Sequence, residues 1–250
     1  MILKMSIIRS HMTTSGSSIA KNGYKAEQKV ADALNKNIEF KSQFSTFIKQ
    51  TITSNFYKLD GTSKTDVTNG TINIQVKKCA PKRFGQVDRC WLSKLIKNNP
   101  TLKPIEHVMS SVCEMPLMSC GKLCDKTAKR TKLTHDHFNH EDIRLLLSTL
   151  NENKKQILNH AFNGYEIDTI PHYFFGLMGD SLTIYRVCDI IDHLMTFDFK
   201  IRKSGTVIEL GNSFTIQRKG GDSGKKTANQ IQFKLVFSNL KIEHKMTFNI

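Results

Sequence analysis

An acid, an amide and an amine lie close together in one short segment, at Asp66, Gln75 and Lys77. Between them stands Asn69-Gly70, flanked by β-forming residues, which is the strongest short hairpin signal because a type I′ turn needs positive φ at both central residues. If these two residues form the loop, Asp66 faces Asn73, and the alternation of side chains along a strand puts it on the face of Gln75 and Lys77. Neighbours on such a face are about 7 Å apart, so the three groups can serve one ligand.

Their chemistry matches the hydrolysis of a phosphate ester. An aspartate binds hard divalent ions well, and Mg²⁺ takes only one or two protein ligands besides water and phosphate oxygens. An amide oxygen is a weaker ligand that can still bind the ion or its water. A lysine beside the attacking water can orient it, activate it or stabilise negative charge. The alternative is ordinary turn chemistry at Asp66 and a solvated strand face at Gln75 and Lys77.

Composition points to a polyanionic partner. The chain has 250 residues, enough for one large domain or two small ones, and its 39% apolar content supports a core. Its 37 basic and 22 acidic residues give a formal charge of +15 without a polybasic tail, which favours nucleic acid first. A merely soluble basic protein is the alternative. No apolar run approaches the length of a membrane span, and the first ten residues lack a signal sequence, so we expect a cytoplasmic protein.

The cysteines predict free thiols rather than a structural framework. Six cysteines occur without framework spacing, which fits a reducing compartment. One cluster has zinc-ligand chemistry but contains no CxxC pair, so zinc is not expected. The cluster comprises Cys113, Cys120, Cys124, His135, His137 and His140.

The elements that must position these residues form a mixed α/β pattern. Residues 1–20 are rich in serine and threonine, and we expect them to be flexible. A helix is predicted from Asn22, because Ala26, Val30, Ala33 and Leu34 recur at helical spacing. We interpret Trp91 as a core residue of the second helix rather than a base-stacking platform. Further predictions are β-like structure at 44–57, helices at 87–99, 140–158 and 189–195, and strands at 182–187, 206–210, 214–219 and 229–237.

Two blocks of unusual sequence stand in order along the chain. They resemble the small type II restriction endonucleases that recognise GCGC and cut after the first G, members of the PD-(D/E)XK nuclease superfamily. A weaker third match runs from Ala20 to Asp32. The first block is Ile74–Lys77 with Lys82–Asp88 and Trp91-Leu92, and the second is Thr215–Gly224 with Thr227–Asn229 and Gln232–Lys234.

The resemblance implies a fold, an activity and partners. It implies a single endonuclease domain over 1–250, built on a mixed central β-sheet flanked by helices. Segment 66–91 would hold the catalytic hairpin and a DNA-wedge turn, and 206–237 a DNA-reading β-hairpin. The implied enzyme is a prokaryotic type II deoxyribonuclease that needs Mg²⁺, with Mn²⁺ as a substitute, and acts on double-stranded DNA. A companion methyltransferase would act on the same site, and the enzyme is a possible homodimer.

The resemblance also implies roles for individual residues. Asp66 corresponds to the metal-binding acid, Gln75 replaces the superfamily's usual second acid, and Lys77 corresponds to the catalytic lysine. Glu27, on the first helix, is a further candidate metal ligand. Phe84 matches an aromatic wedge and Gln86 a polar residue beside it. The implied DNA-binding residues are Lys82, Arg83, Phe84, Gln86, Gln217, Arg218, Lys219, Gly221, Asp222 and Ser223.

The residues of the second block support DNA contact independently. Thr215, Gln217 and Lys219 share one strand face, as do Gln232 and Lys234 on the next strand, and such side chains read base edges in the major groove. The alternative is a solvated hairpin with a flexible glycine-rich tip. At the level of function, the alternatives are a structure-specific or repair nuclease with the same core, or a DNA-binding protein without catalysis.

Overall fold

The computed structural model describes residues 22–59, 64–112, 140–164, 170–202, 207–218 and 230–250. The chain divides into two compact units, each assembled from separate segments. The first unit comprises 1–79, 166–186 and 244–250, and the second comprises 80–165 and 187–243. A single endonuclease domain over the whole chain stays a prediction, and the predicted flexibility of 1–20 lies outside the described residues.

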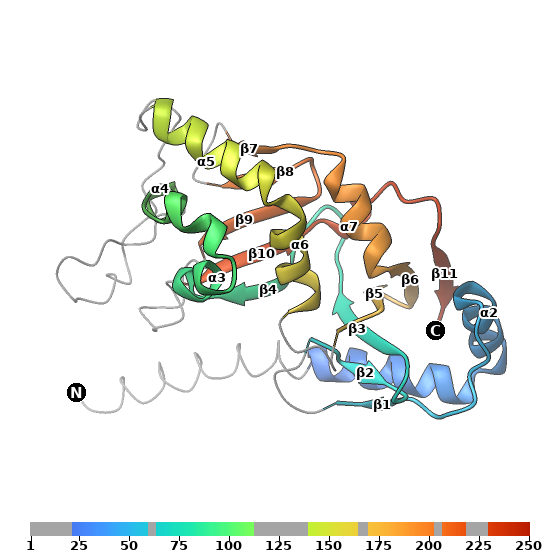
Figure 1. Cartoon of the computed structure of the whole chain (residues 1–250). Helices are drawn as coiled ribbons and strands as arrows, with labels where there is room; N and C mark the ends of the chain where they lie inside the picture. The colour runs from blue at the N-terminus through green and yellow to red at the C-terminus, as the bar shows by residue number, and fades with distance from the viewer. Residues whose placement is uncertain (1–21, 60–63, 113–139, 165–169, 203–206, 219–229) are drawn as a thin grey trace, which may run out of the picture. The chain divides into compact units, whose positions relative to one another are not determined.

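A six-stranded mixed sheet forms the centre of the first unit (Figure 1). Strands β3 and β5 pair in parallel, and every other neighbouring pair is antiparallel. This arrangement, together with the helices packed on it, confirms the predicted α/β class with a mixed sheet flanked by helices. In spatial order the strands are β1 (Tyr57–Lys58), β2 (Val67–Thr68), β3 (Asn73–Lys78), β5 (Tyr173–Met178), β6 (Ser181–Arg186) and β11 (Met246–Asn249).

Two helices share the core of the first unit with this sheet. The predicted helix occupies 22–36, and its Ala26, Val30 and Leu34 are buried. The second helix, α2 (Ile38–Ile48), overlaps a segment predicted as β-like, so that prediction is wrong there. The Asn37 side chain accepts a hydrogen bond from the Phe40 N–H at 3.0 Å and caps α2. Burial of phenylalanines one turn apart then outweighs the modest helix propensity of this segment.

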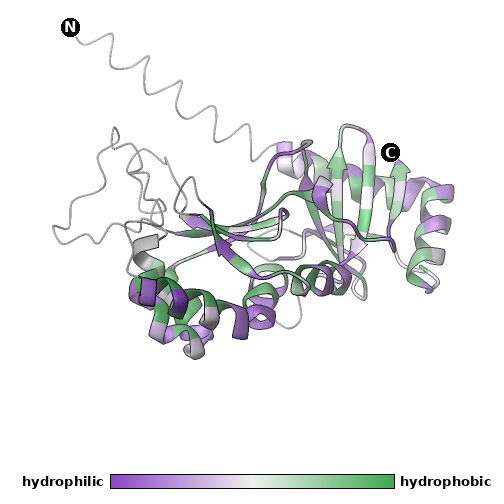
Figure 2. Ribbon diagram, turned by 90° about the horizontal axis from the view of Figure 1, so that it is seen from above, coloured by the Kyte–Doolittle hydropathy of each residue, from purple (hydrophilic) through white to green (hydrophobic). Residues whose placement is uncertain are grey.

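The second unit contains a five-stranded antiparallel sheet with helices gathered on one side of it (Figure 2). On that side the ring of Phe162 lies 6.1 Å from Phe214, and the ring of His160 lies 5.4 Å from Phe233. The strands in order are β4 (Gly85–Cys90), β10 (Ile231–Leu235), β9 (Phe214–Arg218), β8 (Ile208–Leu210) and β7 (Phe199–Ile201). The helices are α3 (Leu92–Asn98), η1 (Pro100–Ile105), α4 (Glu106–Val112), α5 (His140–Glu152), α6 (Lys154–Asn163), α7 (Val187–Met195) and η5 (Phe237–Asn239).

The predicted second helix begins too early, because residues 85–90 form strand β4 and only α3 is helical. The register between β4 and β10 shifts at one point, so that Gln86 pairs with Lys234 and Asp88 with Phe233, and Val87 is the extra residue. Such a bulge spaces the buried Val87 and Cys90 three residues apart, as a helix would. The prediction that Trp91 is a core residue is also wrong, because its side chain is 40% exposed.

The other predicted elements are found close to their expected positions. The four late strands correspond to β6, β8, β9 and β10, and the helix at 189–195 lies within α7. The predicted helix at 140–158 is two helices, since Asn153 separates α5 from α6. No helix in the described residues is long and apolar enough to cross a membrane.

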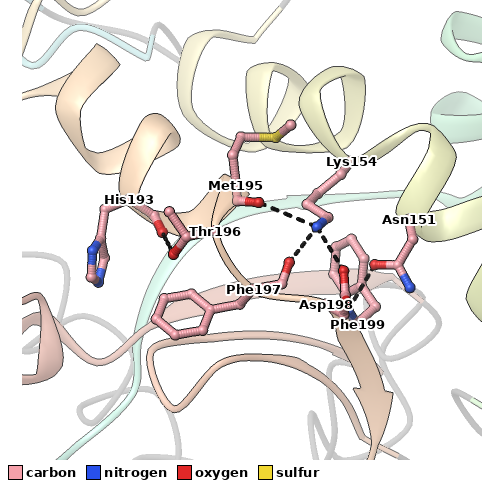
Figure 3. A network of polar contacts seen from close by, with 8 residues as sticks. All are labelled: Asn151, Lys154, His193, Met195, Thr196, Phe197, Asp198 and Phe199. Atoms are coloured by element: carbon pink, nitrogen blue, oxygen red, sulfur yellow. Dashed lines mark hydrogen bonds and ion pairs between the residues drawn. The ribbon is translucent and has the colours of Figure 1, made fainter.

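One buried lysine holds the chain between α7 and β7 (Figure 3). The Lys154 ammonium donates to the carbonyl oxygens of Met195, at 3.3 Å, and Phe197, and it pairs with Asp198 at 3.1 Å. Nearby, the Asn151 side chain accepts from the Phe199 N–H at 2.8 Å. The lysine thus satisfies carbonyl groups at the C-terminal end of α7, where a cation is also favoured by the helix dipole.

We expect Lys154→Met to lower the free energy of unfolding by about 2–3 kcal/mol, because buried carbonyl groups lose their donor. The midpoint of thermal unfolding should fall by roughly 5–10 °C in a chain of this size. Lys155→Met, at an exposed position of the same helix, is the matched control and should change it little. Equal midpoints for the two variants would contradict this role for Lys154.

Candidate functional site

The predicted two-residue hairpin loop is replaced by a longer turn. Val67 pairs with Ile74 and Thr68 with Asn73, two positions from the predicted register. Gly70 has a φ of +90°, whereas Asn69 does not have positive φ, so the turn is not type I′. Instead, the Asn69 side-chain oxygen accepts the Ile72 N–H at 2.8 Å. A shift of two keeps the same face of β3 inward, and Ile72, Ile74 and Val76 are buried.

The structure brings Asp66 and Lys77 into direct contact. Asp66 precedes β2, and its N–H donates to the carbonyl of Ile74 at 2.9 Å. Its Oδ2 accepts the Val76 N–H at 2.7 Å and the Lys77 Nζ at 3.2 Å. Both side chains are largely buried, with 15% and 28% of their surface exposed. Both of these contacts fall on Oδ2, so among the described residues Oδ1 is the oxygen left to meet a cation.

Gln75 lies on β3 between Ile74 and Val76, whose backbone groups both hydrogen-bond with Asp66. It is 2% exposed, and its Oε1 has no hydrogen-bond partner in the described part of the chain. An unpaired acceptor in a buried position is costly, which is why nearly all such groups find a partner. One carboxylate oxygen and one amide oxygen would suit Mg²⁺, which keeps most of its water and needs few protein ligands.

Glu27, on the helix at 22–36, belongs to the same unit and faces Lys58 of β1. Its Oε2 lies 3.9 Å from Lys58 Nζ, and both side chains are mostly buried. The Lys58 ammonium also lies 4.4 Å from the centre of the Tyr24 ring. The role of Glu27 as a further metal ligand stays a prediction.

The cysteine beside the candidate site is not a reactive thiol. Burial raises the pKa of Cys79 to about 12, although the charge of Lys77 opposes the shift. The thiol is therefore protonated at neutral pH, and a protonated thiol is a poor nucleophile. Among the described residues no group of three His, Cys, Asp or Glu side chains could hold a metal. Of the cysteine–histidine cluster, only His140 is described; Cys113, Cys120, Cys124, His135 and His137 lie outside.

In the second unit, polar residues share the sheet face turned away from Phe214 and Phe233. On β10, Gln232 pairs with Gln217 of β9 on one side and with Arg89 of β4 on the other. Lys234 of the same strand pairs with Thr215 of β9 and with Gln86 of β4. The Gln232 Nε2 donates to the Gln86 Oε1 at 2.8 Å, which puts these side chains on one face. We call the set the polar face; its members are Gln86, Arg89, Thr215, Gln217, Gln232 and Lys234.

The basic turn before β4, Lys82 to Phe84, is held by contacts with Ser238 and Arg202. Lys82 has a φ of 56°, a strained value for a residue other than glycine, and its N–H donates to Ser238 Oγ at 3.3 Å. Lys82 and Arg83 are exposed, and Phe84 is half-buried. The guanidinium of Arg202 lies 5.4 Å from the Phe84 ring centre and its Nε donates to Glu209 at 2.6 Å.

The remaining predicted DNA contacts are described only in part. Arg218 belongs to β9 through its backbone pairing with Ile231. Lys219, Gly221, Asp222 and Ser223 lie outside the described residues. The sequence analysis missed two contacts, that of Arg202 with the Phe84 ring and that of Gln232 with Gln86. Each contact joins residues more than a hundred positions apart, so no local spacing could indicate it.

Comparison with known proteins identifies the family of this chain. Residues 52–241, most of the chain, match the family model described as R.HinP1I restriction endonuclease. That range includes Asp66, Gln75 and Lys77 and the polar face. Among individual curated proteins no significant match is found. Because the family model covers more than half of the sequence, the chain belongs to the R.HinP1I restriction endonuclease family and is a type II restriction endonuclease that acts on DNA.

Proposed function

We propose that this enzyme recognises GCGC in double-stranded DNA, cuts after the first G and requires Mg²⁺. The observation that carries the catalytic part is the contact between Asp66 and Lys77 beside Gln75, whose side-chain oxygen has no partner among the described residues. In the proposal, an acid, an amide and an amine so placed would form the Gln variant of a PD-(D/E)XK site. The specificity for GCGC rests on the sequence resemblance and on membership of the family.

Each residue of this group has a distinct task in the proposal. Asp66 Oδ1 and Gln75 Oε1 would hold the ion, with Glu27 as a further candidate ligand. When bound, the ion polarises the scissile phosphate and neutralises charge that develops on it. Lys77, held by Asp66, donates to the attacking water or to a phosphate oxygen. This fixes the water in line and limits its movement, which lowers the entropic part of the barrier.

DNA contact is assigned to the second unit. Lys82 and Arg83 would neutralise phosphates, Phe84 would wedge into the base stack, and Gln86 would contact a base edge. Gln217 and Arg218 would contribute from β9, and Lys219, Gly221, Asp222 and Ser223 from the segment after it. A palindromic site would suit a homodimer, and host DNA in a prokaryotic cytoplasm would need protection by a methyltransferase of the same specificity.

The test is digestion of plasmid DNA with Mg²⁺, with an EDTA control, followed by sequencing of the ends. Discrete fragments that end within GCGC are expected. Discrete fragments at another short sequence would refute the assigned site and keep the enzyme class. Cleavage only at nicks, flaps or mismatches would identify a structure-specific nuclease, and intact DNA after binding would overturn the catalytic assignment.

A change at Gln75 tests the amide in particular. We expect Gln75→Glu to retain measurable cleavage, because a carboxylate can occupy the same position and bind Mg²⁺ or Mn²⁺ more strongly. Gln75→Leu should reduce cleavage by about 10²-fold or more, because the ligand oxygen is lost while the volume is kept. Rates should be measured in both metals on folded protein. A folded Gln75→Glu enzyme that is inactive in both would show that the amide has a task other than metal binding.

A further inference from the structure

Two glutamines of the polar face are joined by one hydrogen bond with a defined direction. The amide NH₂ of Gln232 donates to the side-chain oxygen of Gln86 at 2.8 Å. We propose that Gln232 is a positioning residue that turns the NH₂ of Gln86 toward DNA, so that Gln86 selects a guanine over an adenine. The inference rests on the proposed function and deepens it by naming the base that this part of the face reads.

The two positions differ in exposure in the way this role requires. Gln232 is 9% exposed and lies on β10, which pairs with β4 on one side and β9 on the other, whereas Gln86 is exposed at the start of β4. The bulge at Val87 places Gln86 beside Lys234 and Arg89 beside Gln232. A buried side chain on a paired strand has little rotamer freedom, so it can fix the orientation of its exposed neighbour.

The direction of the bond decides which base edge fits. A glutamine that reads adenine in two contacts must accept from N6 through its own oxygen while it donates to N7. In Gln86 one lone pair of that oxygen already accepts from Gln232, which holds the oxygen toward β10, and the NH₂ is the group with both of its hydrogens left to donate. The major-groove edge of guanine offers two acceptors, N7 and O6, so a side chain held with its NH₂ available to donate suits guanine.

The charged neighbours act in the same direction. Arg89 and Lys234 are aligned with the two glutamines on the same face, and both carry only donors. Their positive potential favours the acceptor-rich edge of guanine and disfavours the exposed amino groups of adenine and cytosine. Because donor side chains lie on both sides of the pair of glutamines, we expect this face to contact guanine on both sides of the pair.

The test uses the full-length enzyme and short duplexes that contain its cleavage site. Each guanine is replaced in turn by 7-deazaguanine, which lacks N7, or by 2-aminopurine, which lacks O6. Affinity is measured in Ca²⁺ and cleavage in Mg²⁺. Cleavage of the unmodified duplex by the wild type tests the proposed function by itself. A wild type that does not cleave this duplex would refute the proposed function, whereas the modified duplexes test the inference.

The wild type should lose about tenfold in affinity when one guanine is modified. That sensitivity should fall to twofold or less in Gln86→Ala and in Gln232→Leu. Gln232→Glu, which can only accept, should draw the Gln86 NH₂ inward and weaken discrimination against adenine at the same base. Gln232→Glu also keeps the inference testable if the Gln232→Leu variant does not fold. Gln156→Leu, on the exposed side of α6, is the control and should behave as the wild type.

Three results would count against the inference. One is undiminished sensitivity to the modified guanine in both Gln232 variants, since Gln86 would then be positioned without Gln232. Another is a wild type that is insensitive to every modified guanine while it cleaves its site. A loss of affinity that is equal for modified and unmodified DNA would show a merely structural role and also count against it.

Discussion

Lys77→Ala should reduce the cleavage rate by at least about 10³-fold and leave DNA affinity within about threefold of the wild type. Lys77 is the cation that Asp66 holds at 3.2 Å, and in our proposal it positions the attacking water and stabilises charge on the phosphate. A positioned proton donor or acceptor contributes about 10²–10⁴ to rate, and loss of the positive charge adds to that. Affinity comes mainly from phosphate contacts elsewhere, so it changes little.

The neighbouring Lys78 offers the matched control. It is the next residue of β3, it is exposed and it carries the same charge. Lys78→Ala should cut DNA at a rate within a few-fold of the wild type. Single-turnover rates at saturating enzyme separate chemistry from binding, and filter binding in Ca²⁺ gives the affinity. If Lys77→Ala lost binding and cleavage together, or if both lysine variants lost activity equally, the assigned role of Lys77 would be wrong.

That Asp66, Gln75 and Lys77 share one face of the hairpin was predictable from sequence for a particular physical reason. β3 is buried between two partner strands, so the alternation of its side chains is strict, and Ile74 and Val76 reveal which residues face the other way. The error of two positions in the hairpin loop did not change the face. What alternation could not give is the reach of Asp66, whose carboxylate contacts the Val76 N–H from outside β2.

The rest of the fold depends on contacts that are distant in sequence. The bulge in β4 gave its buried residues helical spacing, and only pairing with β10 shows that this segment is a strand. Likewise, α2 is stabilised by burial of Phe40 and Phe44 against strands that follow later in the chain. The pairing of Gln86 with Gln232 exists only because β4 and β10 are neighbours. Such features need the tertiary structure.

Asp66→Asn should reduce cleavage by about 10³-fold or more while the fold is retained. Asparagine can still accept the Val76 N–H through its side-chain oxygen, so we expect the free energy of unfolding to change by less than about 1 kcal/mol. The variant loses the negative charge that would attract Mg²⁺ and that pairs with Lys77. A loss of 10³ in rate corresponds to about 4 kcal/mol of transition-state stabilisation.

The dependence of DNA binding on divalent ions separates this variant from Lys77→Ala. If Asp66 anchors the ion between protein and phosphate, Ca²⁺ should strengthen DNA binding by the wild type and by Lys77→Ala but not by Asp66→Asn. Asp192→Asn removes the same charge from an exposed position of α7 and should respond to Ca²⁺ as the wild type does. An Asp66→Asn enzyme whose affinity still rises with Ca²⁺ would place the ion on other ligands, and the metal role would then pass to Gln75 and Glu27.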